Sequence, residues 1–209
     1  MSELFISALV TFFVVIDPPG CAPIFASLTS GAPAAHRRRM ALRSIAVASA
    51  VLLMFALFGR QFLHALGVGL DAFRIAGGIM LFLIALEMVF EKRTQRREER
   101  AEAVREAQIS QREWEDISVF PMGIPMLAGP GSIASAMLLI SRAEGLQQRL
   151  IVLAAMAVVL AVTLCSLLLA PALMRLLGPK IEAMVTRILG VILAALATQF
   201  VIDGIRASF

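Results

Sequence analysis

Six long apolar segments restrict what this chain of 209 residues can fold into. A helix needs roughly 20 mostly apolar residues to cross the hydrocarbon layer of a bilayer. Segments of about that length lie at 4–28, 44–62, 72–90, 119–140, 150–169 and 184–202. They lack the alternation of a barrel strand and are about twice too long for one. The sequence therefore predicts an all-α polytopic membrane protein with six transmembrane helices.

Composition agrees with a lipid environment. Hydrophobic residues make up 59% of the chain and charged residues 16%, with a mean hydropathy of +0.86. A soluble domain of this length is far less apolar. The first apolar run has no Lys or Arg before it and no small-residue cleavage site after it, so we expect it to be a retained span and not an export signal.

The positive charges predict how the chain is oriented. With the N-terminus outside, the outer side carries few of them: Arg60, Arg74, Arg142, Arg149 and Arg206. The inner loops carry the larger share, at positions 37–39, 43, 92–112, 175, 180 and 187. This bias is the positive-inside signature. It predicts a bacterial inner membrane location with periplasmic N- and C-termini and a cytoplasmic 91–116 loop. The net charge of +4 therefore indicates membrane topology, with no nucleic-acid partner.

The longest connection, residues 91–116, mixes both signs of charge and contains no Pro or Gly. It is predicted to be a cytosolic helix that continues the third span; a regulatory or partner-docking role is the alternative. The predicted organisation is a first three-helix repeat at 1–90, a charged cytoplasmic linker at 91–117 and a second three-helix repeat at 118–209.

The two halves contain matching sequences at similar offsets. The third span reads FRIAGGIMLF from Phe73 and the sixth reads TRILGVILAA from Thr186. The first contains DPPGCAPIFASLTS from Asp17 and the fourth AGPGSIASAMLLIS from Ala128. Because each half has three spans, an odd number, the second half must enter the membrane from the opposite face. We therefore expect an inverted 3+3 repeat with discontinuous helices 1 and 4.

The proline and glycine residues inside the first span predict the break. Pro18, Pro19 and Pro23 lack N–H donors, while Gly20 tolerates backbone angles that other residues resist. The helix should stop near Ile16 and restart near Cys21. Each backbone group left without a partner at this depth costs several kcal/mol, roughly, so these groups must face protein, water or a ligand.

Both breaks together predict a binding site at the middle of the membrane. The amides of Gly20, Cys21 and Ala22, and of Gly131, Ser132 and Ile133, would form two positive helix starts suited to a carboxylate. The carbonyls around residues 15–16 and 127–128 would receive an ammonium group or a cation. The predicted substrate-binding residues are Asp17, Pro18, Gly20, Cys21, Ala22, Ala128, Gly129, Gly131, Ser132 and Ile133. Proline kinks that serve packing alone are the alternative.

Asp17 is the residue with the most specific prediction. A carboxyl deep in a span is costly when ionised, which makes Asp17 a candidate for proton or ion coupling. The alternative is a structural helix cap. No enzyme activity, catalytic residue, metal site or cofactor is predicted, because no predicted span contains a His or a paired-aspartate site. Cys21 and Cys165 are expected to be small buried residues and not a disulfide.

Three motifs give the chain a family resemblance. DPPGCAPIF at 17–25, RIAGGIMLF at 74–82 and PMGIPMLAGPGSI at 121–133 resemble the MarC family of bacterial inner-membrane proteins, which is grouped with small neutral amino acid transporters of the LysE-like superfamily. The resemblance implies six spans with discontinuous first and fourth helices. It also implies transport of glycine, alanine or similar amino acids, coupled to a proton or cation gradient. Cys21 stands where the family often has Asn.

Two other functions are compatible with the same residues. One is export of other small metabolites or drugs, and the other is a passive channel lined by the broken helices. The expected partners are thus a neutral amino acid as substrate and the lipid bilayer.

Overall fold

The computed structural model describes residues 2–90, 98–99, 102 and 116–208. In this part of the chain every regular element is helical. The elements are α1 (Ser2–Ile16), α2 (Pro18–Leu28), α3 (Ala34–Ala65), α4 (Leu70–Val89), η1 (Ser118–Leu127), α6 (Pro130–Arg142), α7 (Gly145–Leu168) and α8 (Ala170–Ser208). The predicted all-α fold is confirmed.

The predicted spans are found with altered boundaries. Five helical segments are long and apolar enough to cross a membrane, and the bent pair of η1 and α6 makes a sixth. The first span, Ser2–Leu28, comprises α1 and α2. Both α3 and α8 begin well before the apolar runs that predicted them. The predicted cytosolic helix at 91–116 lies almost entirely outside the described residues.

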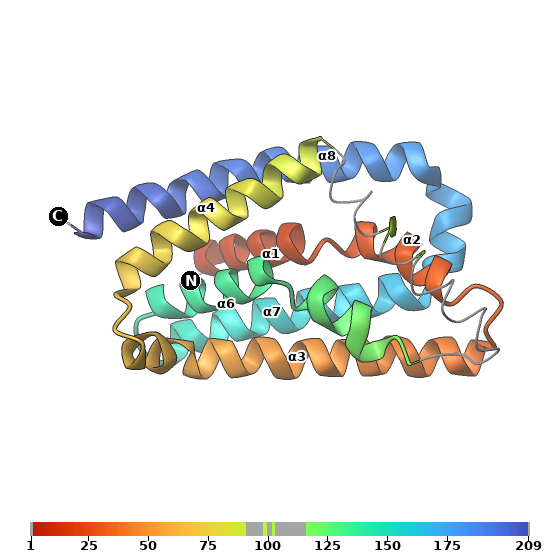
Figure 1. Cartoon of the computed structure of the whole chain (residues 1–209), viewed down its shortest axis with the longest axis horizontal. Coiled ribbons are helices and arrows are strands. Elements are labelled where there is room, and N and C mark those ends of the chain that lie inside the picture. Colours follow the sequence, from red (N-terminus) through yellow and green to blue (C-terminus); the bar gives the residue numbers. More distant parts are fainter. Residues whose placement is uncertain (1, 91–97, 100–101, 103–115, 209) are drawn as a thin grey trace.

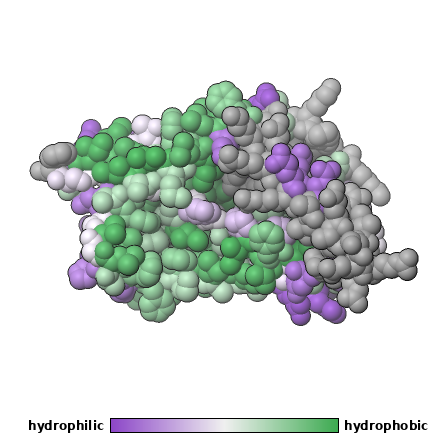
Figure 2. Space-filling view, viewed as in Figure 1, coloured by the Kyte–Doolittle hydropathy of each residue, from purple (hydrophilic) through white to green (hydrophobic). Residues whose placement is uncertain are grey.

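The helices run side by side along the long axis of the molecule, and the two termini lie toward the same end of it (Figure 1). Apolar side chains cover the middle of the visible face, with hydrophilic residues toward its ends (Figure 2). Many large apolar side chains of the protein are exposed, among them Phe58, Leu83 and Val191. Their exposure to water would be unfavourable, whereas contact with lipid tails costs nothing. The protein is therefore an integral membrane protein.

Close packing of α4 on α8 forms one side of the bundle. A Cβ atom placed on Gly78 would lie 2.9 Å from the carbonyl oxygen of Ala197, and one on Gly190 would lie 3.1 Å from the carbonyl oxygen of Ala85. Glycine allows the two backbones to approach because it has no side chain, as is common between helices in membranes. Small residues in the third and sixth spans predict such close helix packing, and the contacts of Gly78 and Gly190 confirm it.

The remaining spans pack in two corresponding pairs. The first span, α1 with α2, packs on α7, and the fourth span, η1 with α6, packs on α3. An inverted repeat would produce this pairing, because it relates the first span to the fourth and the second to the fifth. The inverted relation itself stays a prediction.

Substitution of Gly78 by alanine should destabilise the bundle by about 1–3 kcal/mol, because the new methyl group would overlap backbone atoms of α8 that cannot move aside. Gly69→Ala is the matched control, since a Cβ at Gly69 meets no atom within 4 Å. Thermal unfolding of the purified protein in detergent measures both. Equal melting temperatures for the two variants would contradict the packing role of Gly78.

Candidate functional site

The first break is one residue wide. Asp17, between α1 and α2, has φ 60 and ψ 65, the left-handed conformation. Pro18 and Pro19 occupy the first turn of α2. The predicted restart near Cys21 was therefore wrong. The amides of a first helical turn have no partner within the helix, so prolines fit there without loss.

Asp17 caps the helix that follows it. Its carboxyl group is 1% exposed, and its Oδ1 accepts a hydrogen bond from the backbone N–H of Gly20 at 3.1 Å. The Asp17 carbonyl oxygen accepts from the N–H of Cys21 at 3.0 Å. A Cβ on Gly20 would lie 2.2 Å from Asp17 Oδ2, so only glycine lets the carboxyl group fold over this turn. The capping alternative is thus what the structure shows, while substrate binding and ion coupling stay predictions.

The prolines also change the last turn of α1. In a continuous helix the amides of residues 18 and 19 would donate to the carbonyl oxygens of Val14 and Val15. Pro18 and Pro19 have no N–H to donate. The Ile16 carbonyl oxygen accepts from Cys21 Sγ at 3.4 Å instead of from the amide of Gly20. Buried carbonyl oxygens thus gather at the end of α1.

The second break takes more residues than the first. η1 is a π-helix, in which each N–H donates to the carbonyl oxygen five residues earlier. The N–H of Met122 donates to Ile117 O at 3.2 Å, and that of Ala128 donates to Gly123 O at 2.9 Å. Phe120 and Ile124 are extended and each precedes a proline, as expected from the clash that proline imposes on the residue before it. η1 and α6 meet at an angle of 54°.

Two glycines allow this compact turn. A Cβ on Gly129 would lie 2.5 Å from the carbonyl oxygen of Pro125, and one on Gly123 would lie 2.5 Å from that of Ser118. Gly129, a predicted site residue, therefore has a clear structural role as the residue that begins α6. Gly123 was not singled out by the sequence; its place two residues after Pro121 was the available signal.

The two breaks meet in the interior of the bundle. A Cβ on Gly131 would lie 3.1 Å from Val15 Cγ1, so the start of α6 packs directly against the end of α1. Leu81 and Ile84 of α4 cover the same glycine. The predicted site residues around this contact are buried: Asp17, Pro18, Gly20, Cys21, Ala22, Ala128, Gly129, Gly131 and Ser132, with Ile133 half-buried. The structure therefore shows both breaks buried inside the bundle.

The starts of the two half-helices do not pack against each other closely. α2 packs mainly on α7 and α8, and α6 packs mainly on α3, α4 and α1. The amides of Gly20 and Cys21 meet Asp17, whereas Gly131 and Ser132 lie beside the end of α1. The start of α6 and the end of α1 are thus the parts of the predicted site that the structure brings together.

Ser135 adds an unexpected polar group near this contact. Its side chain is fully buried, and its Oγ has no hydrogen-bond partner in the described part of the chain. It follows Ser132 by three residues, so both hydroxyl groups lie on one face of α6. This spacing was the signal that sequence analysis missed. A buried hydroxyl without a partner is costly and marks a place where a polar ligand can bind.

Ion pairs hold the fourth span at both of its ends. Arg142, at the end of α6, contacts Asp203 of α8 at 2.5 Å and lies over the ring of Phe200. At the other end Asp116 contacts Arg43 of α3 at 2.7 Å. The Ser118 hydroxyl holds the pKa of Asp116 below its usual value, helped by the Ser118 amide and Arg43 and opposed by partial burial. The charged ends therefore connect the broken span to two different helices.

Among the described residues no three His, Cys, Asp or Glu side chains gather closely enough to hold a metal ion. Cys21 and Cys165 are not joined in a disulfide. Cys21 is buried as predicted, but Cys165 is exposed on the surface of α7, contrary to the prediction.

Comparison with known proteins decides the family. The model of the family described as "MarC family integral membrane protein" matches residues 2–209. The chain belongs to the MarC family. This confirms the resemblance carried by the proline-glycine motifs of both breaks.

MarC relatives occur in archaea and bacteria. The chain is 36% identical to a UPF0056 membrane protein of Methanocaldococcus jannaschii, over 99% of this chain and 98% of the relative. It is 32% identical to the UPF0056 inner membrane protein YhgN of Escherichia coli K12, again over 99% and 98% of the two chains. It is 30% identical to the UPF0056 membrane protein YvbG of Bacillus subtilis, over 100% and 97%. No solved structure matches the chain.

The cap at the first break predicts unequal effects of two substitutions. Asp17→Ala should lower the free energy of unfolding by about 2 kcal/mol or more, because it removes the cap and places alanine in the left-handed conformation. Asp17→Asn keeps an acceptor oxygen and a residue that tolerates this conformation, so it should lose clearly less stability than Asp17→Ala. Thermal unfolding in detergent separates them. Equal stability of the Ala and Asn variants would contradict the capping role.

Proposed function

We propose that this MarC protein is a secondary transporter of small neutral amino acids, such as glycine and alanine, coupled to a proton or cation gradient. The observation that supports this most directly is the contact between the two breaks, Gly131 against Val15, inside the bundle. Transporters commonly place substrate sites where two interrupted helices meet near the middle of the membrane. An enzymatic function has no comparable support among the described residues.

The chemistry of the two helix ends fits a zwitterion. Pro18 and Pro19 have no N–H to donate, and a carbonyl oxygen can accept two hydrogen bonds, so the end of α1 is an acceptor-rich region suited to an ammonium group. The first amides of α6 have no acceptor within their own helix, and the helix dipole makes them favourable partners for a carboxylate. The two groups of an α-amino acid are thus complementary to the two helix ends.

The surroundings of the contact favour a small and uncharged side chain. Gly131, Ser132 and Ser135 offer little side-chain volume, and Val15, Leu81 and Ile84 close the space beside Gly131. In the described part of the chain the buried charged side chains are limited to Asp17. A substrate with a second charge would therefore enter without an oppositely charged partner for it, apart from Asp17.

Asp17 provides a physical route for coupling. When ionised, its carboxylate makes a charge-assisted hydrogen bond to the amide of Gly20, which is stronger than one between neutral groups. Protonation would weaken this bond and loosen the start of α2. A proton on Asp17 would therefore change the stability of the break, which is the property that coupling requires.

Transport also needs the two ends of the site to open in turn. The ion pair of Arg142 with Asp203 and that of Arg43 with Asp116 hold the fourth span at opposite ends of the molecule. Movement of η1 and α6 against α3 and α8 would separate one pair while the other persists. The buried breaks favour such a carrier over a passive channel, which would present a continuous pore.

Replacement of Asp17 by asparagine should abolish gradient-driven uptake. In proteoliposomes with an imposed proton gradient, labelled alanine uptake should fall by about tenfold or more, because the variant keeps the cap but cannot bind or release a proton. Exchange of labelled alanine against an internal alanine pool should persist, since exchange needs no net proton movement. Gradient-driven uptake equal to that of the unmodified protein would reject Asp17 as the coupling group. Absence of exchange in both proteins would reject the carrier.

Ser135 gives a test of binding that does not depend on transport. Ser135→Ala should raise the free energy of unfolding by about 1 kcal/mol, because a buried hydroxyl without a partner is removed. The same variant should lose most of the thermal stabilisation that added alanine provides. Ser166→Ala is the matched control, since the Ser166 hydroxyl is exposed and bonds within its own helix to Val162 O. Unchanged stabilisation by alanine in Ser135→Ala would place the site elsewhere.

A further inference from the structure

A second site lies away from the breaks, between the end of α3 and the end of α6. A small cavity of about 60 Å³, partly open to the surface, lies between α3, α4, α6 and α7 there. The ends of α3 and α6 and the starts of α4 and α7, which supply its lining residues, lie toward the end of the molecule where both termini are found (Figure 1). Gly59 allows α3 to lie close to Met137 of α6, which lines the cavity, because a Cβ on Gly59 would collide with the Met137 side chain. The site shares no residue with the contact between the breaks.

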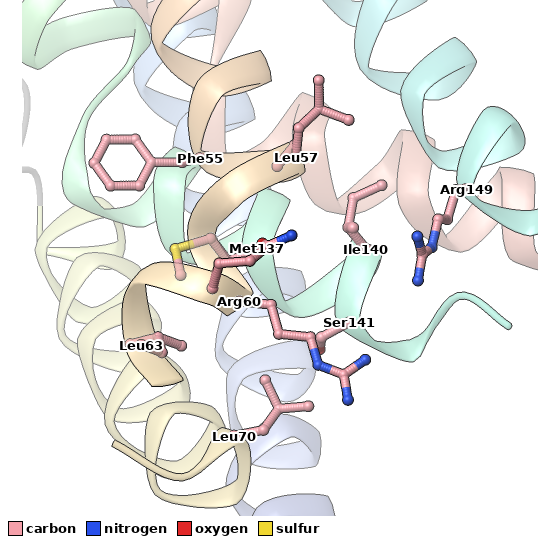
Figure 3. A pocket seen from close by; sticks show the side chains of 11 residues that line it. Phe55, Leu57, Arg60, Leu63, Leu70, Met137, Ile140, Ser141 and Arg149 are labelled. Atoms are coloured by element: carbon pink, nitrogen blue, oxygen red, sulfur yellow. The ribbon is translucent and has the colours of Figure 1, made fainter. Parts of the chain in front are cut away.

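Two arginines border this cavity. Figure 3 shows Arg60 of α3 and Arg149 of α7 extending beside Ile140 and Ser141 of α6. No Asp or Glu lines the cavity, and neither arginine makes an ion pair with a residue that the structure describes. By contrast, Arg142, one residue after Ser141, is paired with Asp203. Two guanidinium groups that line one cavity are complementary to a phosphate, which arginine binds through paired hydrogen bonds.

Apart from the polar side chains of Gln61 and Ser141, the rest of the cavity is apolar and continues onto the lipid-facing surface. Its other lining includes Phe55, Leu57, Leu63, Leu70, Met137 and Ile140. On α3 the neighbouring apolar side chains are also exposed, including Met54 at 50%, Phe58 at 61% and Phe62 at 56%. A ligand with a charged head at the arginines and an apolar tail along α3 would satisfy both parts.

The depth of Arg60 also points to lipid. Arg43 and Arg60 lie roughly 25 Å apart along α3 at about 1.5 Å per residue, close to the thickness of the hydrocarbon layer. The stretch between them contains no charged residue. Arg60 therefore lies near the level of the lipid phosphates. Free phosphate in water would gain nothing from the apolar walls.

We propose that the cavity lined by Arg60, Arg149 and the apolar side chains of α3 and α6 binds an anionic glycerophospholipid, with the phosphate at the two guanidinium groups and an acyl chain along α3. Anionic lipids bind basic pockets between transmembrane helices through this combination of contacts. The site would connect α3 to α6 and α7 through the lipid. This inference does not depend on the transport function.

Native mass spectrometry of the detergent-purified protein tests the site with added phosphatidylglycerol and, separately, phosphatidylcholine. The unmodified protein should retain phosphatidylglycerol preferentially. The double substitution Arg60→Gln with Arg149→Gln should reduce that retention by about tenfold or more, because it removes both phosphate partners. Arg206→Gln, which removes an exposed arginine from the last turn of α8 away from the cavity, should leave it unchanged.

Additional measurements distinguish a bound lipid from a free anion in the cavity. Inorganic phosphate at millimolar concentration should not displace the lipid; displacement would mean that the site takes a free anion and would overturn the proposal. Equal retention of both lipids, or an equal loss in Arg206→Gln, would overturn it as well. Ser141→Leu keeps both arginines and fills the cavity, so it should also lose retention even if the double variant fails to fold. Full retention in Ser141→Leu would reject the cavity as the site.

Discussion

Every backbone polar group inside a bilayer must find a partner, and this requirement governs the structure wherever a helix stops. The first span resolves it with a single residue. Asp17 supplies a carbonyl oxygen to the amide of Cys21 and a carboxylate oxygen to the amide of Gly20. The fourth span resolves it differently, with hydrogen bonds between residues five apart in η1 and the close turn at Gly129. Two breaks with similar motifs thus reach the same end by different local geometries.

The glycines divide the bundle into parts with different roles. Gly78, Gly190 and Gly204 bring α4 and α8 into contact along their lengths, and a pair of helices packed on backbone atoms resists relative movement. Gly123 and Gly129 instead permit a turn. The pair of α4 and α8 is therefore the natural rigid support, while η1, α6 and the start of α2 are the parts where a few hydrogen bonds determine the conformation. The proposed alternating access requires this division.

Much of the fold could be predicted because hydropathy and backbone chemistry act locally. The apolar runs indicated the spans, Pro18 and Pro19 indicated the end of α1, and the small residues of the third and sixth spans indicated close packing. The width of each break could not be predicted, because it depends on which carbonyl or carboxylate reaches the stranded amides. The capping conformation of Asp17 is such a case. The unpaired hydroxyl of Ser135 is another, since only the packing around α6 shows that its Oγ has no partner in the described residues.

The two alternatives for Asp17, a structural cap and an ion-coupling group, concern the same hydrogen bond. An ionised carboxylate makes a stronger hydrogen bond to the amide of Gly20 than a neutral group does, whereas asparagine would accept the same hydrogen bond without carrying a charge. A capping role therefore does not compete with the proposed coupling, because both would act through this one hydrogen bond. Asparagine would cap α2 without a group that can bind a proton, so the charge at this position is the property that capping alone does not require.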